Sequence, residues 1–323
     1  MPEVAVLGTG LMGAKVCKRL VSCGYGVRGW NRTPEKANRL AEIGVRPCAT
    51  AAEAVEGADV VLLMLADAHA IRDVLLSDAN TKALLAGKTI LQMGTIGPKE
   101  SASIGSEVSS AGGSYVEAPV LGSQPEAEKG TLLIMVGAEA DPRDTPAGPV
   151  WPLLRALGQE PNIHFIGPVG TAAAVKLALN QLIASLTVGF STSLGLVQRS
   201  GAPVDKFMSI LRASALYAPT YDKKLQKMLD RDYGAANFPT KHLLKDVRLF
   251  ESEAAAAGLD TAVQAALSGV IASAMAKGLQ DCDYSAVFDA IVEPSSRGSG
   301  DAAGGSSAGD GSSRAQPGSA ADV

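Results

Sequence analysis

The sequence has little cysteine and no pattern of metal ligands. Its four cysteines are scattered along the chain without the spacing of a metal site, at Cys17, Cys23, Cys48 and Cys282. We therefore expect reduced thiols in an intracellular protein, with no disulfide framework and no bound metal.

The sequence also has no cluster of basic residues and no long apolar run outside amphipathic helices. Its 29 Lys and Arg are outnumbered by 33 Asp and Glu, for a net charge of -4. Nucleic-acid binding needs clustered cations, so no such partner is expected. A membrane span needs about 18 apolar residues or more, so none is expected. An apolar strand begins at Val4 and leaves no room for a targeting peptide, and the chain does not end in Ser-Lys-Leu, which favours the cytoplasm.

What is present is a globular composition over 323 residues, 46% of them hydrophobic, enough for two domains. Up to about residue 166, apolar strands alternate with helices, which predicts an α/β fold with a Rossmann-type, mostly parallel sheet. We expect strands at Val4–Leu7, Val27–Trp30, Val60–Leu65, Thr89–Met93, Tyr115–Val120, Leu132–Val136 and His164–Ile166. Helices are expected at Leu11–Cys23, Pro34–Ile43, Ala51–Glu56, Ala68–Leu76 and Pro98–Ala111.

The second part of the chain, residues 167–294, has helical patterns only. A long interdomain helix is predicted over Val169–Ser200, spanning about 45 Å. Such a helix usually needs a partner to cover its apolar faces, so self-association is expected. Further helices are expected at Pro203–Ser214, Leu243–Ala257, Thr261–Lys277 and Tyr284–Val292. Residues 295–323 are rich in Ser and Gly and should form a disordered tail.

A glycine-rich fingerprint lies between the first strand and the first helix. It reads Gly8-Thr9-Gly10-Leu11-Met12-Gly13. In a dinucleotide site, the first glycine makes the tight turn, the second lets the backbone approach the pyrophosphate, and the third permits close packing of helix and strand. The helix N-terminus favours the phosphates, with Leu11 and Met12 in its first turn.

Arg32 indicates which dinucleotide is bound. NAD enzymes place an acidic residue after the second strand to hold the ribose hydroxyls, whereas this chain has Arg32 between Asn31 and Thr33. An arginine suits a 2′-phosphate, so NADP (as NADPH) is the expected cofactor; a solvated surface arginine is the alternative. Leu65 ends the strand predicted at Val60–Leu65, and Ala66 and Thr95 follow strands, all at the ligand-facing edge of the sheet.

Lys176 and Asn180 lie four residues apart on an otherwise apolar helix, and therefore on one face of it. Burial of a lysine lowers its pKa, which makes it a candidate proton donor. The alternative is a lysine that reaches solvent beside a surface amide.

Together, five ordered motifs resemble the β-hydroxyacid dehydrogenase family, and within it the glyoxylate/succinic semialdehyde reductases. The resemblance runs from Val4 to about Val292. The motifs are GTGLMG, WNRT, MGTIGP, EAPVLGS with GTL, and the Lys176–Asn180 helix followed by FPTKHLLKD.

The resemblance implies a homodimer or homotetramer, and it implies roles for individual residues. Lys176 would be the general acid for hydride transfer, with Asn180 orienting it or the substrate. Lys245 would lie near the cofactor and the acid group of the substrate. The implied substrate pocket comprises Thr95, Leu121, Gly122, Ser123, Phe238 and Asp246. As alternatives, Phe238 would pack in the core, and Lys245 and Asp246 would form a surface ion pair.

Two residues depart from the family pattern: Leu121 and Gly94 each stand where serine is usual. The expected activity is NADPH-dependent reduction of small aldehyde acids, glyoxylate to glycolate or succinic semialdehyde to 4-hydroxybutyrate. The alternatives are a 3-hydroxyisobutyrate or tartronate semialdehyde type dehydrogenase, and a non-catalytic scaffold protein of the same fold.

Overall fold

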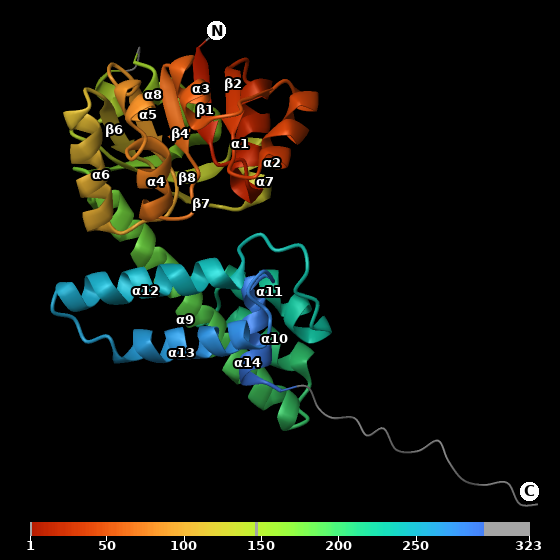
Figure 1. The fold of residues 1–323 in the computed structure, drawn as a ribbon. Coiled ribbons are helices and arrows are strands. Elements are labelled where there is room, and N and C mark those ends of the chain that lie inside the picture. The colour runs from red at the N-terminus through yellow and green to blue at the C-terminus, as the bar shows by residue number, and fades with distance from the viewer. Residues whose placement is uncertain (1, 146–147, 294–323) are drawn as a thin grey trace, which may run out of the picture. The chain divides into compact units, whose positions relative to one another are not determined.

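The first strand shows why the N-terminal part folds as a parallel sheet. Val4 to Leu7 are at most 1% exposed, and such a continuous apolar run forms a strand buried on both faces. The computed structural model describes residues 2–145 and 148–293, and the tail predicted for residues 295–323 lies outside the described residues (Figure 1).

Within that part of the chain, nine strands form one sheet in the order β3-β2-β1-β4-β5-β6-β8-β7, with β9 paired to β8. The six strands from β3 to β6 in this order are parallel, and β8 is antiparallel to both β6 and β7. The predicted α/β class is therefore confirmed. The strands are β1 Glu3–Leu7, β2 Gly26–Trp30, β3 Arg46–Pro47, β4 Val60–Leu63, β5 Thr89–Gln92, β6 Ser114–Glu117, β7 Val120–Leu121, β8 Leu132–Gly137 and β9 Gly158–Gly167.

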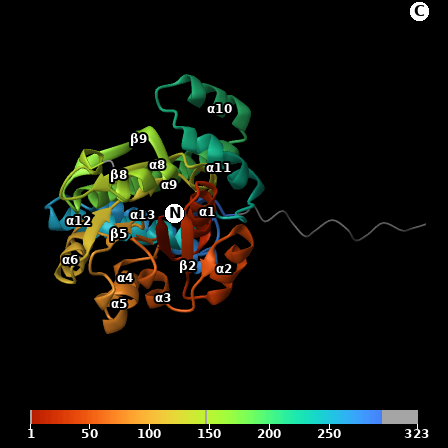
Figure 2. The same cartoon turned by 90° about the horizontal axis from the view of Figure 1, so that it is seen from above.

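Helices cover both faces of the sheet (Figure 2). One core joins α1, α7 and α8 to the side chains of Val4 and Val6, and the other joins α3, α4 and α6 to Ala5 and Leu7. Successive side chains of β1 therefore point to opposite faces of the sheet and pack into two separate cores. The helices of this part are α1 Leu11–Ser22, α2 Pro34–Asn38, η1 Arg39–Ile43, α3 Ala51–Glu56, α4 Ala68–Leu75, α5 Ala79–Ala83, α6 Pro98–Ser110, α7 Gln124–Lys129, η2 Pro142–Asp144 and α8 Val150–Leu157.

The part that follows β9 is helical, as predicted. Helix α9, Thr171–Arg199, is 29 residues long, and α11, α12, α13 and α14 pack against it. By length and composition α9 is apolar enough to cross a membrane, a criterion that the core helix of a globular protein also meets. The remaining helices are α10 Val204–Ala213, α11 Pro219–Asp230, α12 Thr240–Ala256, α13 Ala262–Ala276, η3 Tyr284–Ala286 and α14 Val287–Ile291.

Two predicted strands differ from the observed ones. The single strand Tyr115–Val120 is two strands, β6 and β7, because the chain bends at Ala118-Pro119 and proline has no N–H for the ladder. Strand β9 begins six residues before the predicted His164, since its first half is a polar, mostly exposed segment without apolar alternation. The sequence analysis also missed β3, α5, α7, α8 and α11.

Candidate active site

Lys176 lies in the second turn of α9, where the helix meets the sheet. Its side chain is only 8% exposed, which excludes a solvent-exposed lysine. Among the described residues its ammonium has no hydrogen-bond partner. Burial lowers the pKa of Lys176 from 10.5 to about 8; the carboxylate of Asp246 opposes this shift and Lys245 adds to it. The amine therefore changes protonation state close to neutral pH.

A cluster of polar side chains lies beside Lys176: Asn180 from α9, and Lys245 and Asp246 from α12. Asn180 donates a hydrogen bond of 2.6 Å from Nδ2 to Oδ2 of Asp246, which is 1% exposed. Lys245 Nζ lies 3.0 Å from Asp246 Oδ1 and donates a 2.5 Å hydrogen bond to the Thr95 carbonyl. The surface ion-pair alternative for Lys245 and Asp246 is wrong, because this carboxylate is buried. Thr95, after β5, is thus joined to α12.

A narrow cavity, with no room for a water molecule, lies against Lys176. It is lined by Gln92, Gly94, Thr95, Ile96, Ser101, Glu117, Pro119, Ala173 and Lys176. Gly94 is one of the two departures from the family pattern, and a Cβ there would lie 2.7 Å from the Leu65 carbonyl oxygen. Close packing of two backbones therefore explains this glycine, and a serine would force one of the loops to move.

The glycine fingerprint has the geometry that a dinucleotide requires. Gly8 has φ +100°, and a Cβ there would lie 2.4 Å from the Met64 carbonyl oxygen. A Cβ on Gly13 would lie 1.9 Å from the Gly8 oxygen, whereas Gly10 has open space around it. The buried Thr9 hydroxyl has no hydrogen-bond partner among the described residues. Tight turn, close packing and an open backbone approach thus fall at the three positions expected of a pyrophosphate site.

The other residues predicted for the cofactor lie along the same edge of the sheet. Arg32 follows β2, is exposed, and forms no hydrogen bond or ion pair within the described residues. Its neighbour Asn31 donates a hydrogen bond to the Thr33 carbonyl. Leu65 and Ala66 follow β4; Leu65 is half-buried and Ala66 is exposed. These positions leave the Arg32 guanidinium available to a phosphate.

The predicted substrate loop follows β7. Leu121 is half-buried and pairs with Leu133, and Gly122 has φ +125°. The Ser123 hydroxyl donates a 2.7 Å hydrogen bond to Glu126 Oε2 at the start of α7. That hydroxyl is therefore not free to donate to a substrate carboxylate in place of the serine usual at position 121.

Phe238 packs in the helical part of the protein. Its ring lies edge-to-face with that of Tyr284, with centroids 5.8 Å apart, and it contacts the core formed by α9, α12 and α13. This fits the core-packing alternative, and a contact with substrate stays a prediction.

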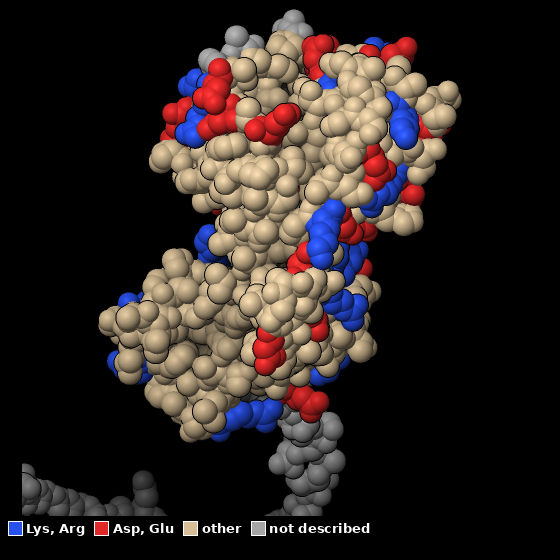
Figure 3. Space-filling model, turned by 90° about the vertical axis from the view of Figure 1, so that its left-hand side faces the viewer, with Lys and Arg blue, Asp and Glu red and all other residues tan. Residues whose placement is uncertain are grey.

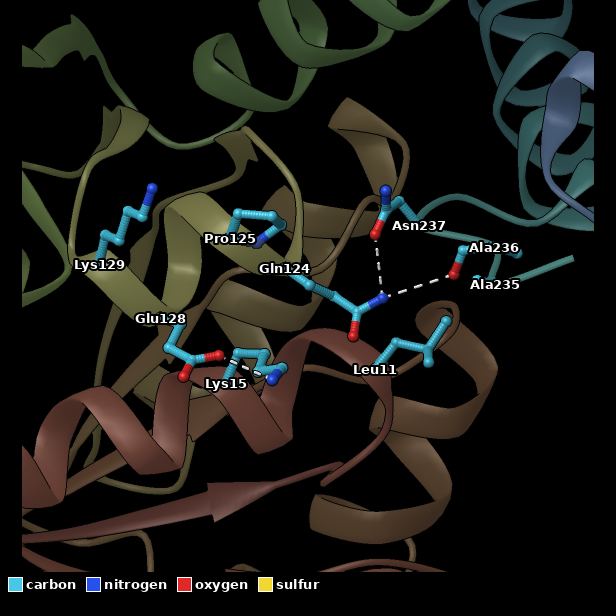
Figure 4. A pocket seen from close by; sticks show the side chains of 9 residues that line it. All are labelled: Leu11, Lys15, Gln124, Pro125, Glu128, Lys129, Ala235, Ala236 and Asn237. Carbon is cyan, nitrogen blue, oxygen red and sulfur yellow. Dashed lines mark hydrogen bonds and ion pairs between the residues drawn. The ribbon is translucent and has the colours of Figure 1, made fainter. Parts of the chain in front are cut away.

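An open groove of about 590 Å³ lies next to these predicted site residues (Figure 4). Leu11, Gln124 and Asn237 line it, and each is the chain neighbour of a predicted site residue. The Gln124 amide spans the groove and donates to Asn237 Oδ1 at 3.2 Å. Its outer end carries the Lys15–Glu128 ion pair.

Glu117 is a site residue that the sequence analysis did not single out. It ends β6, is 1% exposed and lines the Lys176 cavity. A carboxylate inside a buried strand is an unusual residue, and this alone was a signal in the sequence.

Similarity to known proteins agrees with this site. Residues 3–167 match the family of the NAD-binding domain of 6-phosphogluconate dehydrogenase, and residues 170–291 match that of NADP-dependent 3-hydroxyisobutyrate dehydrogenase. Glyoxylate/succinic semialdehyde reductase 1 of Arabidopsis thaliana is 31% identical over 290 residues, 90% of this chain and 98% of that protein.

Two further relatives show the range of proteins with this fold. Cytokine-like nuclear factor N-PAC of Xenopus tropicalis is 29% identical over 90% of this chain and 53% of its own length. The crystal structure of 3-hydroxyisobutyrate dehydrogenase from Salmonella typhimurium has a TM-score of 0.78 at 22% identity, covering 90% of this chain and 99% of that one.

Fold, fingerprint and relatives define an NAD(P)-dependent oxidoreductase that acts on a small molecule. More narrowly, the chain belongs to the β-hydroxyacid dehydrogenase family, as its motifs indicated.

Proposed function

We propose that this protein is an NADPH-dependent reductase of small aldehyde acids, with glyoxylate and succinic semialdehyde as substrates. The observation that carries the proposal is Lys176, a buried amine with a pKa of about 8, on the same cavity as Thr95. The 31% identity to an Arabidopsis reductase named for these two substrates supports it.

In this proposal each residue has a distinct part in the reaction. When bound, the reduced nicotinamide supplies hydride. The ammonium of Lys176 donates a proton to the carbonyl oxygen, on which negative charge develops. The carboxylate of Asp246, which accepts a hydrogen bond from the Asn180 amide, places a negative charge near that ammonium and opposes its loss of the proton. Lys245 holds the loop after β5 in place by donating a hydrogen bond to the Thr95 carbonyl. Steady-state oxidation of NADPH across a panel of small aldehyde and keto acids tests the proposal.

Replacement of Arg32 with leucine should raise KM for NADPH and barely affect NADH. A charge-assisted hydrogen bond contributes about 1.5–3 kcal/mol, so a rise of about tenfold or more is expected. KM for both cofactors is the measurement. Arg39→Leu, the same charge change at an exposed position on η1, is the matched control and should change neither constant. Equal use of NADH and NADPH by the wild type would contradict the assignment of NADP.

Leu121→Ser should improve catalytic efficiency on glyoxylate. The substrate carboxylate gains a hydroxyl donor, and a hydrogen bond to a charged group contributes about 1.5–3 kcal/mol, or about tenfold in kcat/KM. If Leu121 instead contacts the methylenes of succinic semialdehyde, efficiency on that substrate should fall. Measuring both substrates separates the two effects. A fall on both would show that Leu121 is an adapted pocket wall and that glyoxylate is not the preferred substrate.

Two alternatives are supported by particular relatives. A 3-hydroxyisobutyrate or tartronate semialdehyde type dehydrogenase fits the family of residues 170–291. A non-catalytic scaffold protein fits the similarity to a nuclear factor. Adding hydroxyacids with the oxidised cofactor to the substrate panel distinguishes them, because the first oxidises a hydroxyacid and the second turns over nothing while still binding the cofactor.

We also propose that the protein is a homodimer or homotetramer that uses its helical part. Helix α13 contains no charged residue, and Val263 on it is 62% exposed. On the face drawn in Figure 3, charged side chains are sparse over the helical part. An exposed apolar surface of this kind is typical of an interface. Light scattering of the purified chain measures the assembly directly.

A further inference from the structure

Glu117 is a buried carboxylate for which the proposed reaction has no use. Its Oε1 accepts hydrogen bonds from the backbone N–H groups of Gly170 at 2.8 Å, Ala172 at 2.9 Å and Ala173 at 3.3 Å. These are the first donors of α9, which have no partner within their own helix. The residue at the N-cap is Gly170, which has no side chain to satisfy them.

The other carboxylate oxygen is held from α6. The Ser101 hydroxyl donates to Glu117 Oε2 at 2.5 Å, and the Tyr115 hydroxyl lies 3.0 Å from the Ser101 oxygen. Within the described residues no cation pairs with Glu117, so the partial positive charge of the helix N-terminus is what balances this anion. Burial raises the pKa of the Glu117 carboxyl above its ordinary value, and the hydrogen bonds from Ser101 and α9 oppose that rise.

The surrounding backbone leaves space for this carboxylate. Gly137 of β8 is the antiparallel partner of Glu117, and a Cβ on it would lie 2.3 Å from Glu117 Oε1. The acceptor is therefore held between β8 and the first turn of α9. Lys176 comes three residues after Ala173, on the next turn of the same helix, and faces the same cavity as Glu117.

We propose that Glu117 is the positioning residue for Lys176. By accepting hydrogen bonds from the first N–H groups of α9, it fixes the position of this helix, and so of the Lys176 amine, relative to the end of β5. It acts through the helix and not on the substrate. This inference rests on the proposed role of Lys176 as the proton donor. The position of the Lys176 amine is then controlled by Glu117, a residue of the sheet.

The test compares two replacements of nearly equal size. Glu117→Met removes the acceptor, and Glu117→Gln keeps one oxygen for the α9 donors because the hydroxyls of Ser101 and Tyr115 can exchange donor and acceptor roles. Displacement of a catalytic group by about 1 Å can cost about 10²-fold in rate. We therefore expect kcat to fall by about that factor in Glu117→Met with KM for NADPH unchanged, and Glu117→Gln to recover most of it.

A second readout does not require activity. The pH dependence of Lys176 acetylation, followed by peptide mass spectrometry, reports the pKa of its amine. Loosening of the first turns of α9 admits water, so the pKa should rise from about 8 toward 10.5 in Glu117→Met and stay low in Glu117→Gln. If the wild type reduces none of the panel substrates, the proposed function fails, while acetylation still decides whether Glu117 sets the environment of Lys176.

A matched variant separates positioning from general stability. Asp283→Asn breaks a buried ion pair in the helical part, away from Glu117, and should lower Tm while leaving the Lys176 pKa unchanged. Equal effects of Asp283→Asn and Glu117→Met on kcat and on that pKa would overturn the proposal. If Glu117→Met does not fold, Glu117→Asp, which retracts the carboxylate by one methylene, decides: a lower kcat with a raised Lys176 pKa supports the proposal, and unchanged values overturn it.

Discussion

Lys176→Ala should lose nearly all turnover while still binding NADPH. General acid catalysis typically supplies about 10²–10⁴-fold in rate. Lys176 lines the cavity with a nearly buried ammonium, and its pKa of about 8 suits a proton donor near neutral pH. The fingerprint and Arg32 lie on other elements, so the cofactor should bind as before. Turnover and NADPH fluorescence on binding are the two measurements.

The control for Lys176→Ala is Lys206→Ala, an exposed lysine on α10 whose loss should change nothing. A Lys176→Ala variant that kept more than roughly a tenth of wild-type turnover would show that another group donates the proton.

The same lysine predicts the pH dependence. An acid must carry its proton to act, and the pKa of Lys176 is about 8. The rate of carbonyl reduction should therefore be full below that pH and fall as the pH rises through it. Asp246→Asn removes the carboxylate that opposes deprotonation, so the falling limb should move to lower pH. A pH profile of kcat for both proteins tests this, and a limb that does not move would exclude the carboxylate as the cause.

The second large effect concerns stability. Lys224 Nζ lies 2.8 Å from both carboxylate oxygens of Asp283, whose side chain is fully buried, and the ammonium also lies 4.2 Å from the centre of the Tyr284 ring. Removal of one partner of a buried pair leaves the other charge without compensation, which costs about 3–5 kcal/mol. Asp283→Asn should therefore lower the free energy of unfolding by that amount in urea.

An exposed pair in the same part of the chain gives the comparison. Lys241 and Asp281 are 2.6 Å apart, with side chains 44% and 69% exposed, and such pairs contribute little. Lys241→Met should leave the denaturation midpoint unchanged. If Asp283→Asn also left it unchanged, water or another donor would have to compensate Lys224 in the folded state.

The sequence predicted the architecture because its signals are local. The apolar run of β1, the fingerprint after it and the change from strands to helices near Gly167 each depend on neighbouring residues. The first half of β9 and the break at Pro119 were missed because a polar edge strand lacks apolar alternation and a two-residue strand is too short to show a period.

For the site, spacing along one helix was enough to bring Lys176 and Asn180 together. The hydrogen bonds from Asn180 to Asp246, 66 positions away, and from the start of α9 to Glu117 were not predictable, because no local pattern encodes which buried donor meets which acceptor. Gly94 is a similar case, since its packing against Leu65 depends on how two loops approach each other.

The exposure of Arg32 has an evolutionary consequence. Its side chain supports no other described part of the fold, so under the role proposed for Arg32 a single substitution there would change the preferred nicotinamide cofactor without loss of stability. A lineage carrying this protein would then be free to move between the cell's two pools of reducing power, while Glu117 and Lys176, to which we assign the positioning and donation of the proton, stay fixed by their packing.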